Sequence, residues 1–282
     1  MASTADWQAK QYVLFENERT RPVRDLLAAV PAGGTSGPSG TKGTKGTKGT
    51  SGTKGTSGAR VAVDIGCGPG NSTEVLAARF PDAAISGLDS SADMIAAARQ
   101  RLPQCQFELG DVSAWDAPGP YDVILANAVF QWVPDHERLF PALVNKLAVG
   151  GSLAVQMPDN LDEPAHQLLR EVAAQGPWSD QLKGVERTMR HNPTWYYALL
   201  KPLCEGVDVW RTVYHHPLAG GADAVVEWFK GSSLRPFLAK LDGATQQTFL
   251  QRYRDEIARA YPALADGTVL LPFPRLFIVA TR

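Results

Sequence analysis

The sequence predicts an α/β fold: a seven-stranded, mostly parallel sheet with helices on both faces and a helical lid. Three observations predict it. From Arg60 onward, short apolar runs alternate with amphipathic stretches of helical length. A glycine-rich loop directly follows the first apolar run, and residues 217–268 separate the last two runs. Strands that alternate with helices indicate a parallel sheet covered on both sides.

The expected strands and helices follow from the period of the apolar residues. Strands are expected at 61–65, 84–88, 105–109, 121–126, 152–157, 207–215 and 275–281. Helices are expected near 71–80, 92–101, 136–147 and 163–175, with two lid helices near 222–240 and 244–261. A lid of this kind is expected over the carboxyl ends of the strands, where open α/β sheets bind ligands.

Two helices are expected before the first strand. Asp6 is suited to cap the first, in which Gln8, Tyr12, Phe15 and Arg19 share one face at helical spacing. The second is expected to begin at Pro22 and end near Pro31, because proline is favoured at the first helical position. Its apolar face would consist of Val23, Leu26, Leu27 and Val30.

The chain is expected to divide into three parts. Residues 1–34 are N-terminal helices that cover the site, and 59–282 form the main domain, with 177–206 and 217–268 as cap or lid insertions. Between them, residues 35–58 cycle through Gly, Thr, Lys and Ser without a large apolar side chain, so a flexible low-complexity insertion is expected. An inert linker and a basic tether for a polyanion are the two interpretations of this segment.

Composition argues against several classes of partner. The 282 residues carry a net charge of −1, which favours neither nucleic acid nor an anionic membrane surface. The N-terminus has no apolar signal region, and no long uncharged apolar run occurs, so a cytoplasmic protein is expected. Three cysteines at spacings that match no zinc pattern indicate reduced thiols and no metal site. The oligomeric state is left open.

The stretch "VDIGCGPGN" places Gly66, Gly68 and Gly70 between a strand and a helix. Small residues there let the backbone turn sharply and approach a ligand closely. The spacing differs from the dinucleotide fingerprint, and no Gly-Lys-Ser/Thr follows to form a phosphate-binding loop. A doubly wound protein with incidental glycines is the plain alternative.

Polar residues at the next strand ends favour a nucleoside pocket. Asp89 ends the second strand, where a carboxylate can accept both ribose hydroxyls; Asp111 ends the third, and Asn127 ends the fourth. Three stretches in which most of these residues lie resemble motifs of the class I S-adenosylmethionine-dependent methyltransferases: "VDIGCGPGN", "GLDSSADMI" and "GDV". Members of that superfamily have a three-layer Rossmann-like fold. The resemblance implies S-adenosyl-L-methionine as cofactor, with Gly66, Gly68 and Gly70 facing its methionine part, Asp89 on the ribose, Asp111, Val112 and Met94 around the adenine, and Asp64 in the cofactor site.

Stretches outside these motifs resemble one narrower family, the trans-aconitate 2-methyltransferases. They are "FENERTRPVRDLLA", "NAVFQWVPDHERL", "EPAHQLLREVA" and "VLLPFPRLFIVATR", and the similarity covers nearly the whole chain except 35–58. The resemblance implies a carboxyl O-methyltransferase that converts a small tricarboxylic acid, trans-aconitate, to its monomethyl ester.

A tricarboxylate requires cations, and arginine is the preferred bidentate partner of a carboxylate. The candidate substrate residues are Tyr12, Arg19, Arg21, Trp132, His166, Arg170 and Arg275, with Lys230 as a weaker candidate. His166 and Arg170 are four residues apart on one helix, hence expected on one face. Most of these residues also have a plain alternative. Arg19 and Arg170 could pair with nearby acids, and Arg275 could simply start the last strand. Lys230 could be solvated, His166 could cap its helix, and Trp132 could be a core aromatic.

No catalytic side chain is predicted beyond positioning residues. A carboxylate is ionised at pH 7 and can attack the sulfonium methyl without a general base. Two rival functions remain open: a carboxyl methyltransferase acting on a malonyl-carrier protein or another small acid, and a non-catalytic S-adenosylmethionine-binding module.

Overall fold

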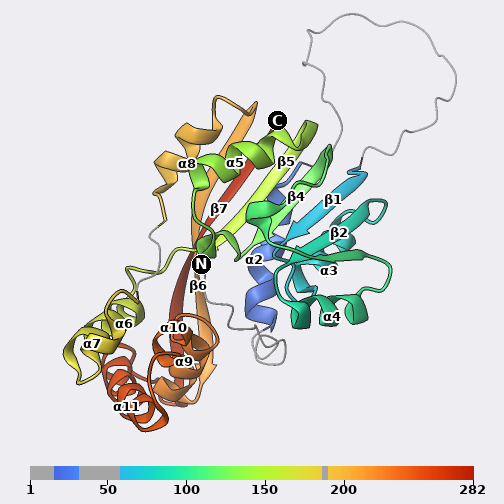
Figure 1. Ribbon diagram of the computed structural model, residues 1–282. Coiled ribbons are helices and arrows are strands. Elements are labelled where there is room, and N and C mark those ends of the chain that lie inside the picture. The colour runs from blue at the N-terminus through green and yellow to red at the C-terminus, as the bar shows by residue number, and fades with distance from the viewer. Residues whose placement is uncertain (1–15, 32–57, 186–189) are drawn as a thin grey trace, which may run out of the picture.

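The computed structural model describes residues 16–31, 58–185 and 190–282. Its centre is one seven-stranded sheet in the order β3-β2-β1-β4-β5-β7-β6 (Figure 1). β1 to β5 pair in parallel, and β7 runs antiparallel to both β5 and β6. The strands are β1 (Val61–Ile65), β2 (Ala84–Asp89), β3 (Gln106–Leu109), β4 (Tyr121–Asn127), β5 (Leu147–Pro158), β6 (Gly206–Ala219) and β7 (Thr268–Thr281). The predicted mostly parallel sheet of seven strands is confirmed.

Alternating side chains give the sheet two apolar faces. On one face, Ala62, Leu125 and Phe277 pack with α2 (Glu16–Ala29) and α3 (Asn71–Arg79). On the other, Val63 and Ile124 pack with α5 (His136–Asn145) and α8 (Pro193–Leu200). We call these the α2 face and the α5 face. α4 (Ala92–Arg101) packs against β2 and β3, and two short 3-10 helices, η1 (Val112–Ala114) and η2 (Phe130–Trp132), follow β3 and β4.

The start of α2 differs from the prediction. The helix spans Glu16–Ala29 and contains Pro22, so Pro22 is not its first residue. Proline in a helix removes one backbone hydrogen bond, but the apolar stripe from Val23 to Val30 is almost fully buried against the sheet, and this packing outweighs the loss. The earlier helix predicted from Asp6, with Gln8, Tyr12 and Phe15, lies outside the described residues.

β6 and β7 are much longer than predicted. They pair from Gly206 with Thr281 to Ala219 with Thr268, whereas β5 pairs only with residues 275–281 of β7. Residues 213–219 and 268–274 therefore extend beyond the end of β5 as a two-stranded arm. Pro217, Pro272 and Pro274 lie in this arm, where an edge ribbon tolerates proline better than a central strand does.

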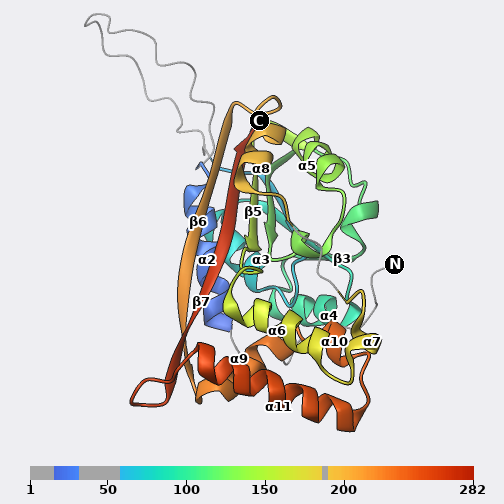
Figure 2. The same cartoon turned by 90° about the vertical axis from the view of Figure 1, so that its left-hand side faces the viewer.

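A second helical group gathers at the end of this arm (Figure 2). It contains α6 (Pro164–Gln175), α7 (Ser179–Leu182), α9 (Gly221–Lys230), α10 (Arg235–Leu238) and α11 (Gly243–Ala260). Trp178, Phe249 and Tyr253 are fully buried in its core. We propose that these five helices form the cap, and that α8, although inside 177–206, belongs to the helix layer of the sheet, because Tyr196 and Leu200 pack on the α5 face.

One side-chain bond connects α2 to the sheet edge. The Tyr214 hydroxyl donates to Asp25 Oδ2 at 2.6 Å, and the Arg21 guanidinium lies 5.4 Å from the Tyr214 ring centre. Since Tyr214 lies on the arm and is 4% exposed, this bond fixes α2 relative to the strands that lead to the cap.

Tyr214→Phe should lower the free energy of unfolding by about 1–2 kcal/mol, because the bond removed has an ionisable carboxyl as acceptor. Urea denaturation measures this loss, and hydrogen exchange should show faster opening of α2. Tyr197→Phe is the matched control, since Tyr197 is 44% exposed, and it should change stability by less than about 0.5 kcal/mol. Equal effects of the two changes would contradict a role for the Asp25 bond.

Candidate active site

The glycine loop is held at the carboxyl end of β2. The Leu88 carbonyl accepts the amides of Gly66 and Cys67 at 2.7 and 3.0 Å. Gly66 has a φ of 68°, and a Cβ there would lie 2.5 Å from Val129, so only glycine fits. Gly68 has a φ of 54°, and a Cβ there would meet nothing within 4 Å. The loop therefore closes tightly on the protein at Gly66 and faces open space at Gly68.

Asp89 joins the glycine loop to the end of β2. Its Oδ2 accepts the Gly68 amide and its Oδ1 accepts the Ser91 amide, both at 2.9 Å. Burial raises the pKa of Asp89, and the backbone amides of Ser91 and Gly68 partly oppose this increase. Ser91 in turn caps α4 by accepting the Met94 amide, and the Met94 side chain is buried. The sequence-predicted Gly68, Asp89 and Met94 thus lie in one local structure.

Asp64 is fully buried behind the loop. Its Oδ2 accepts the hydroxyls of Ser72 and Thr73 at 2.6 and 2.7 Å, whereas its Oδ1 has no hydrogen-bond partner among the described residues. Burial raises the pKa of Asp64 to about 7, and the two hydroxyl bonds only partly oppose this shift. The position therefore combines a carboxyl that titrates near neutrality with one unused acceptor, a combination suited to an approaching cation.

The other predicted cofactor residues line the ends of β3 and β4. The Asp111 carboxylate is exposed and caps η1 by accepting the Ser113 amide at 2.8 Å. Val112 is half-buried next to it. Asn127 ends β4 opposite Gln156 of β5; it is buried, and its Oδ1 has no partner among the described residues.

Polar side chains continue along the α2 face beyond Asn127. Gln156 is completely buried, and its Oε1 accepts Nη1 of Arg275 at 3.0 Å. Arg275 is 3% exposed, and its guanidinium lies 4.8 Å from the Phe273 ring centre. Arg275 of β7 lies opposite Thr212 of β6, which is two residues before Tyr214. The parallel strands β1 to β5 all end at one edge of the sheet, which we call the carboxyl edge. The structure thus places Asn127, Gln156, Arg275 and Tyr214 in a row at the carboxyl edge.

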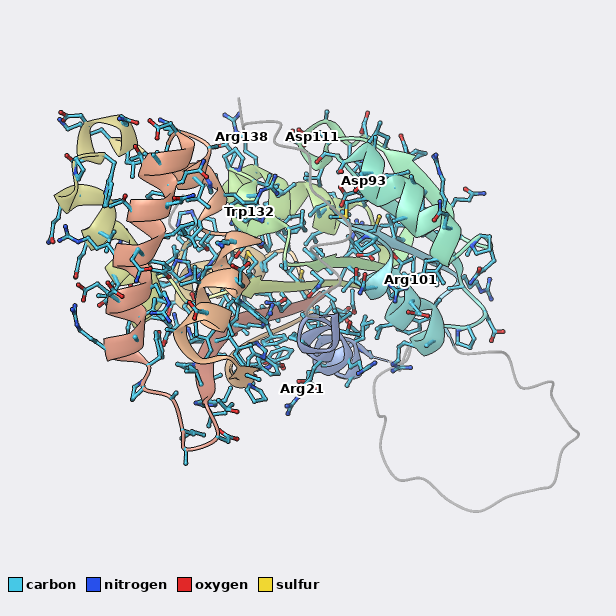
Figure 3. The ribbon with its side chains drawn as sticks, turned by 90° about the horizontal axis from the view of Figure 1, so that it is seen from below. Arg21, Asp93, Arg101, Asp111, Trp132 and Arg138 are labelled. Atoms are coloured by element: carbon cyan, nitrogen blue, oxygen red, sulfur yellow. The ribbon has the colours of Figure 1, made fainter. Side chains whose placement is uncertain are left out.

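The remaining substrate candidates do not converge on one point. Figure 3 shows Trp132 on the side of Asp111 and Arg138, and Arg21 across the sheet on α2. Arg21 is exposed, and its guanidinium lies over the Tyr214 ring. Lys230 pairs with Glu227 at 2.5 Å. Arg19 belongs to α2, but its side chain, like Tyr12, lies outside the described part of the chain.

His166 and Arg170 separate in spite of their helical spacing. His166 is buried, with its ring 5.1 Å from that of Phe229 in the cap. Arg170 is exposed and donates Nη2 to the Leu161 carbonyl at 3.0 Å. The two side chains thus differ in exposure although they are four residues apart on one helix, because a long arginine side chain reaches back along the helix to its preceding loop.

The sequence analysis did not single out several polar residues with low exposure near the site, among them the buried Gln131 and Gln156 and the half-buried Asp159 and Arg190. Gln156 had a visible signal, because it is the one amide in the apolar run "LAVQMP". Asp159 and Arg190 had none, since they are 31 residues apart and form an ion pair only in the fold.

Among the described residues, no helix is both long and apolar enough to cross a membrane.

Comparison with known proteins agrees with this architecture. Residues 62–151 match the model of a methyltransferase domain. The crystal structure of the YcgJ protein from Bacillus subtilis is similar with a TM-score of 0.51, at 12% identity, covering 79% of this chain and 92% of that one. The chain thus has the Rossmann-like class I methyltransferase fold that the motifs predicted.

Full-length relatives identify the family. A trans-aconitate 2-methyltransferase of Rhodopseudomonas palustris (strain BisB5) is 50% identical over 99% of this chain and 100% of its own length. The enzyme of the same name from Methylobacterium nodulans is 50% identical, with 99% of both chains covered, and that of Rhizobium meliloti is 48% identical, with 98% of both covered. The chain is therefore a methyltransferase that belongs to the trans-aconitate 2-methyltransferase family.

Proposed function

We propose that this chain transfers the methyl group of S-adenosyl-L-methionine to one carboxylate of trans-aconitate, which gives a monomethyl ester and S-adenosylhomocysteine. The observation that carries the proposal is identity of about half over the full length to relatives named for this reaction. It supports the small tricarboxylic acid over a carrier protein as the substrate. The free thiols of Cys67, Cys105 and Cys204 fit the cytoplasm as the location.

The carboxyl edge suits the proposed cofactor. The open space at Gly68 would let a ligand approach the loop backbone, whereas Gly66 and Gly70 would shape the loop by packing closely against Val129 and Ala98. Oδ1 of Asp64, which has no hydrogen-bond partner among the described residues, suits the ammonium of a methionine group. Asp89 is positioned by two amides next to this loop and would hold the ribose hydroxyls. Met94, Asp111 and Val112 would surround the adenine, and Asn127 would complete the site at β4. The cofactor supplies an electrophilic methyl group on a sulfonium.

The substrate would lie along the same edge, between the cap and the ends of β4, β5 and β7. We keep Tyr12, Arg19, Arg21, Trp132, His166, Arg170 and Arg275 as proposed substrate contacts. Arg275 is the best supported of these, because it is buried at the carboxyl edge next to Gln156. Arg21 and Arg170 are the least supported, because both are exposed.

Methyl transfer needs orientation more than acid-base chemistry. The cofactor would present this methyl carbon to a carboxylate oxygen of the substrate, and the electron pair of the broken carbon–sulfur bond would stay on sulfur. The carboxylate is already ionised at pH 7, so no protein base has to remove a proton. Opposite charges are neutralised in this step, so a site that excludes water favours it. The protein contributes by holding the two reactants in line.

Transfer of labelled methyl from S-adenosyl-L-methionine to a panel of small polycarboxylates tests the function. We expect label on trans-aconitate that is released by mild base, because a carboxyl ester is base-labile. Label on a malonyl-carrier protein but on no free acid would contradict the proposed substrate. Cofactor binding without transfer to any acceptor would favour a non-catalytic binding module instead.

Asp89→Ala should raise the dissociation constant for S-adenosylhomocysteine by roughly 10- to 100-fold, because charge-assisted hydrogen bonds are lost. Isothermal titration calorimetry measures it, with Asp93→Asn, an exposed acid on α4, as the matched control. A 2′-deoxy form of the ligand should bind wild type more weakly but bind the alanine variant almost as well as the parent ligand. Equal sensitivity of both proteins to the missing hydroxyl would contradict ribose contact by Asp89.

Asp64→Asn should stabilise the ligand-free protein while weakening ligand binding. The wild-type pKa is about 7 in the folded state against 3.8 as the ordinary value, so the folded protein retains a proton that the unfolded chain releases between these values. Wild-type stability is therefore lost as pH rises from about 4 to 7. The variant's advantage in free energy of unfolding should grow through this window and be largest near pH 8.

Asp64→Asn should also change how the affinity for S-adenosylhomocysteine depends on pH. A cationic ligand group favours ionised Asp64, so wild-type affinity for S-adenosylhomocysteine should rise between about pH 5.5 and 7.5. The asparagine variant should bind at least about tenfold more weakly near pH 7.5 and lack this rise. Thermal unfolding and calorimetry across the range measure both effects. A variant with wild-type affinity and the same pH profile would contradict the role of Asp64.

A further inference from the structure

We propose that Arg190, which precedes α8, binds a carboxylate of the substrate through Nε or Nη1 of its guanidinium, neither of which has a hydrogen-bond partner among the described residues. This inference rests on the proposed function and assigns a substrate contact that the motifs did not indicate. It draws on three observations: the burial of Arg190, the incomplete neutralisation of its charge, and its position between the end of β5 and η2.

The side chain of Arg190 is a buried cation with spare donors. It is 6% exposed, and Nη2 donates to Asp159 Oδ1 at 2.5 Å. Its Nε and Nη1 are buried and find no hydrogen-bond partner among the described residues. Buried donors in native proteins almost always have an acceptor, so these two groups are suited to an acceptor that arrives with a ligand.

Asp159 does not fully neutralise Arg190. Its second oxygen, Oδ2, lies 2.5 Å from Nε of Arg211, so one carboxylate is shared by two guanidinium groups. The trio therefore carries one net positive charge. Arg211 is 56% exposed, whereas the Arg190 side chain is 6% exposed, so an anion at Arg190 would neutralise the excess charge of the trio where water has little access. Nε and Nη1 lie on different edges of the guanidinium, so each would donate a single charge-assisted hydrogen bond to a carboxylate oxygen, which suits a polycarboxylic acid.

The location of Arg190 connects it to the methyl-transfer edge. Asp159 directly follows β5, and its amide donates to the Pro274 carbonyl of β7 at 2.8 Å. His191 directly follows Arg190 in the chain, and its ring centre lies 6.4 Å from that of His136. His136 in turn lies 2.7 Å from the Tyr196 hydroxyl and 2.9 Å from the Phe130 carbonyl.

Phe130 begins η2, the turn that carries Trp132. Val129, immediately before it, is the residue that a Cβ on Gly66 would strike. A continuous set of neighbours therefore runs from the glycine loop through η2 and His136 to Arg190. This places the spare guanidinium donors on the α5 side of the carboxyl edge, whereas Arg275 lies on the α2 side. Two arginines on opposite sides of the edge suit an acid with several carboxylates.

The test compares Arg190→Gln and Arg190→Lys with Arg211→Gln. The control variant removes the other partner of Asp159 but leaves Arg190 in place. Calorimetry with S-adenosylhomocysteine-saturated protein gives the dissociation constant for trans-aconitate, and steady-state kinetics give kcat/KM. We expect Arg190→Gln to weaken trans-aconitate binding roughly 10- to 100-fold, with Arg190→Lys intermediate. S-adenosylhomocysteine affinity should be unchanged, and Arg211→Gln should stay within about twofold of wild type.

Dicarboxylates that each lack a different carboxylate of trans-aconitate separate contact from structural damage. If Arg190 holds one carboxylate, the dicarboxylate without that group should bind wild type and Arg190→Gln almost equally. A uniform loss for the tricarboxylate and every dicarboxylate, or no loss at all, would overturn the assignment while leaving the proposed function intact. Failure of the wild-type protein to bind or methylate trans-aconitate would instead overturn the proposed function, and this inference with it.

Discussion

The attachment of the glycine loop to the carboxyl end of β2 is the constraint on which the rest of the site depends. The Leu88 carbonyl and the Asp89 carboxylate together accept three successive amides, those of Gly66, Cys67 and Gly68. This attachment fixes the loop next to Val129 and η2, and it turns the Gly68 backbone toward open space. The proposed cofactor site depends on this local geometry. So does the set of neighbours that connects the glycine loop through η2 and His136 to Arg190.

Several buried polar groups at the carboxyl edge have an atom with no hydrogen-bond partner among the described residues. The side chains of Asp64, Asn127, Gln156 and Arg190 are each buried and each keep at least one polar atom without a partner among the described residues. Such groups lower the stability of a folded chain, and elsewhere in a core they are uncommon. Their collection at the ends of β1, β4 and β5 is consistent with a site whose polar atoms are satisfied by its ligands, at a cost in stability of the free protein.

Much of the fold could be predicted from the sequence. The strands and the glycine loop could be predicted because local signals mark them, and Gly66 and Asp89, proposed cofactor residues, stand at strand ends beside apolar runs. The length of β6 and β7 could not, because Pro217, Pro272 and Pro274 usually end strands, and only long-range pairing shows that an edge ribbon accommodates them. α2 starts before Pro22 for a similar reason, since burial of its apolar stripe outweighs a local preference.

Substrate-side residues were harder to predict, because spacing along a helix does not fix where a long side chain ends. His166 and Arg170 share a helix, yet one is buried in the cap and the other is exposed and bonds the Leu161 carbonyl. Arg190 had no local signal, since its partner Asp159 is distant in sequence. Ion pairs between remote segments depend on the whole fold, and for this reason the low exposure of Arg190 became visible only in three dimensions.

A crystal structure of the protein with S-adenosylhomocysteine and trans-aconitate bound together tests the central claim most directly. The account predicts the sulfur of the product cofactor at the glycine loop, its ribose on Asp89, and the acid at the carboxyl edge with one carboxylate on Arg190 and one carboxylate oxygen directed at the sulfur. Trans-aconitate bound away from the sulfur, or a cofactor outside the Gly66–Gly70 loop, would contradict it.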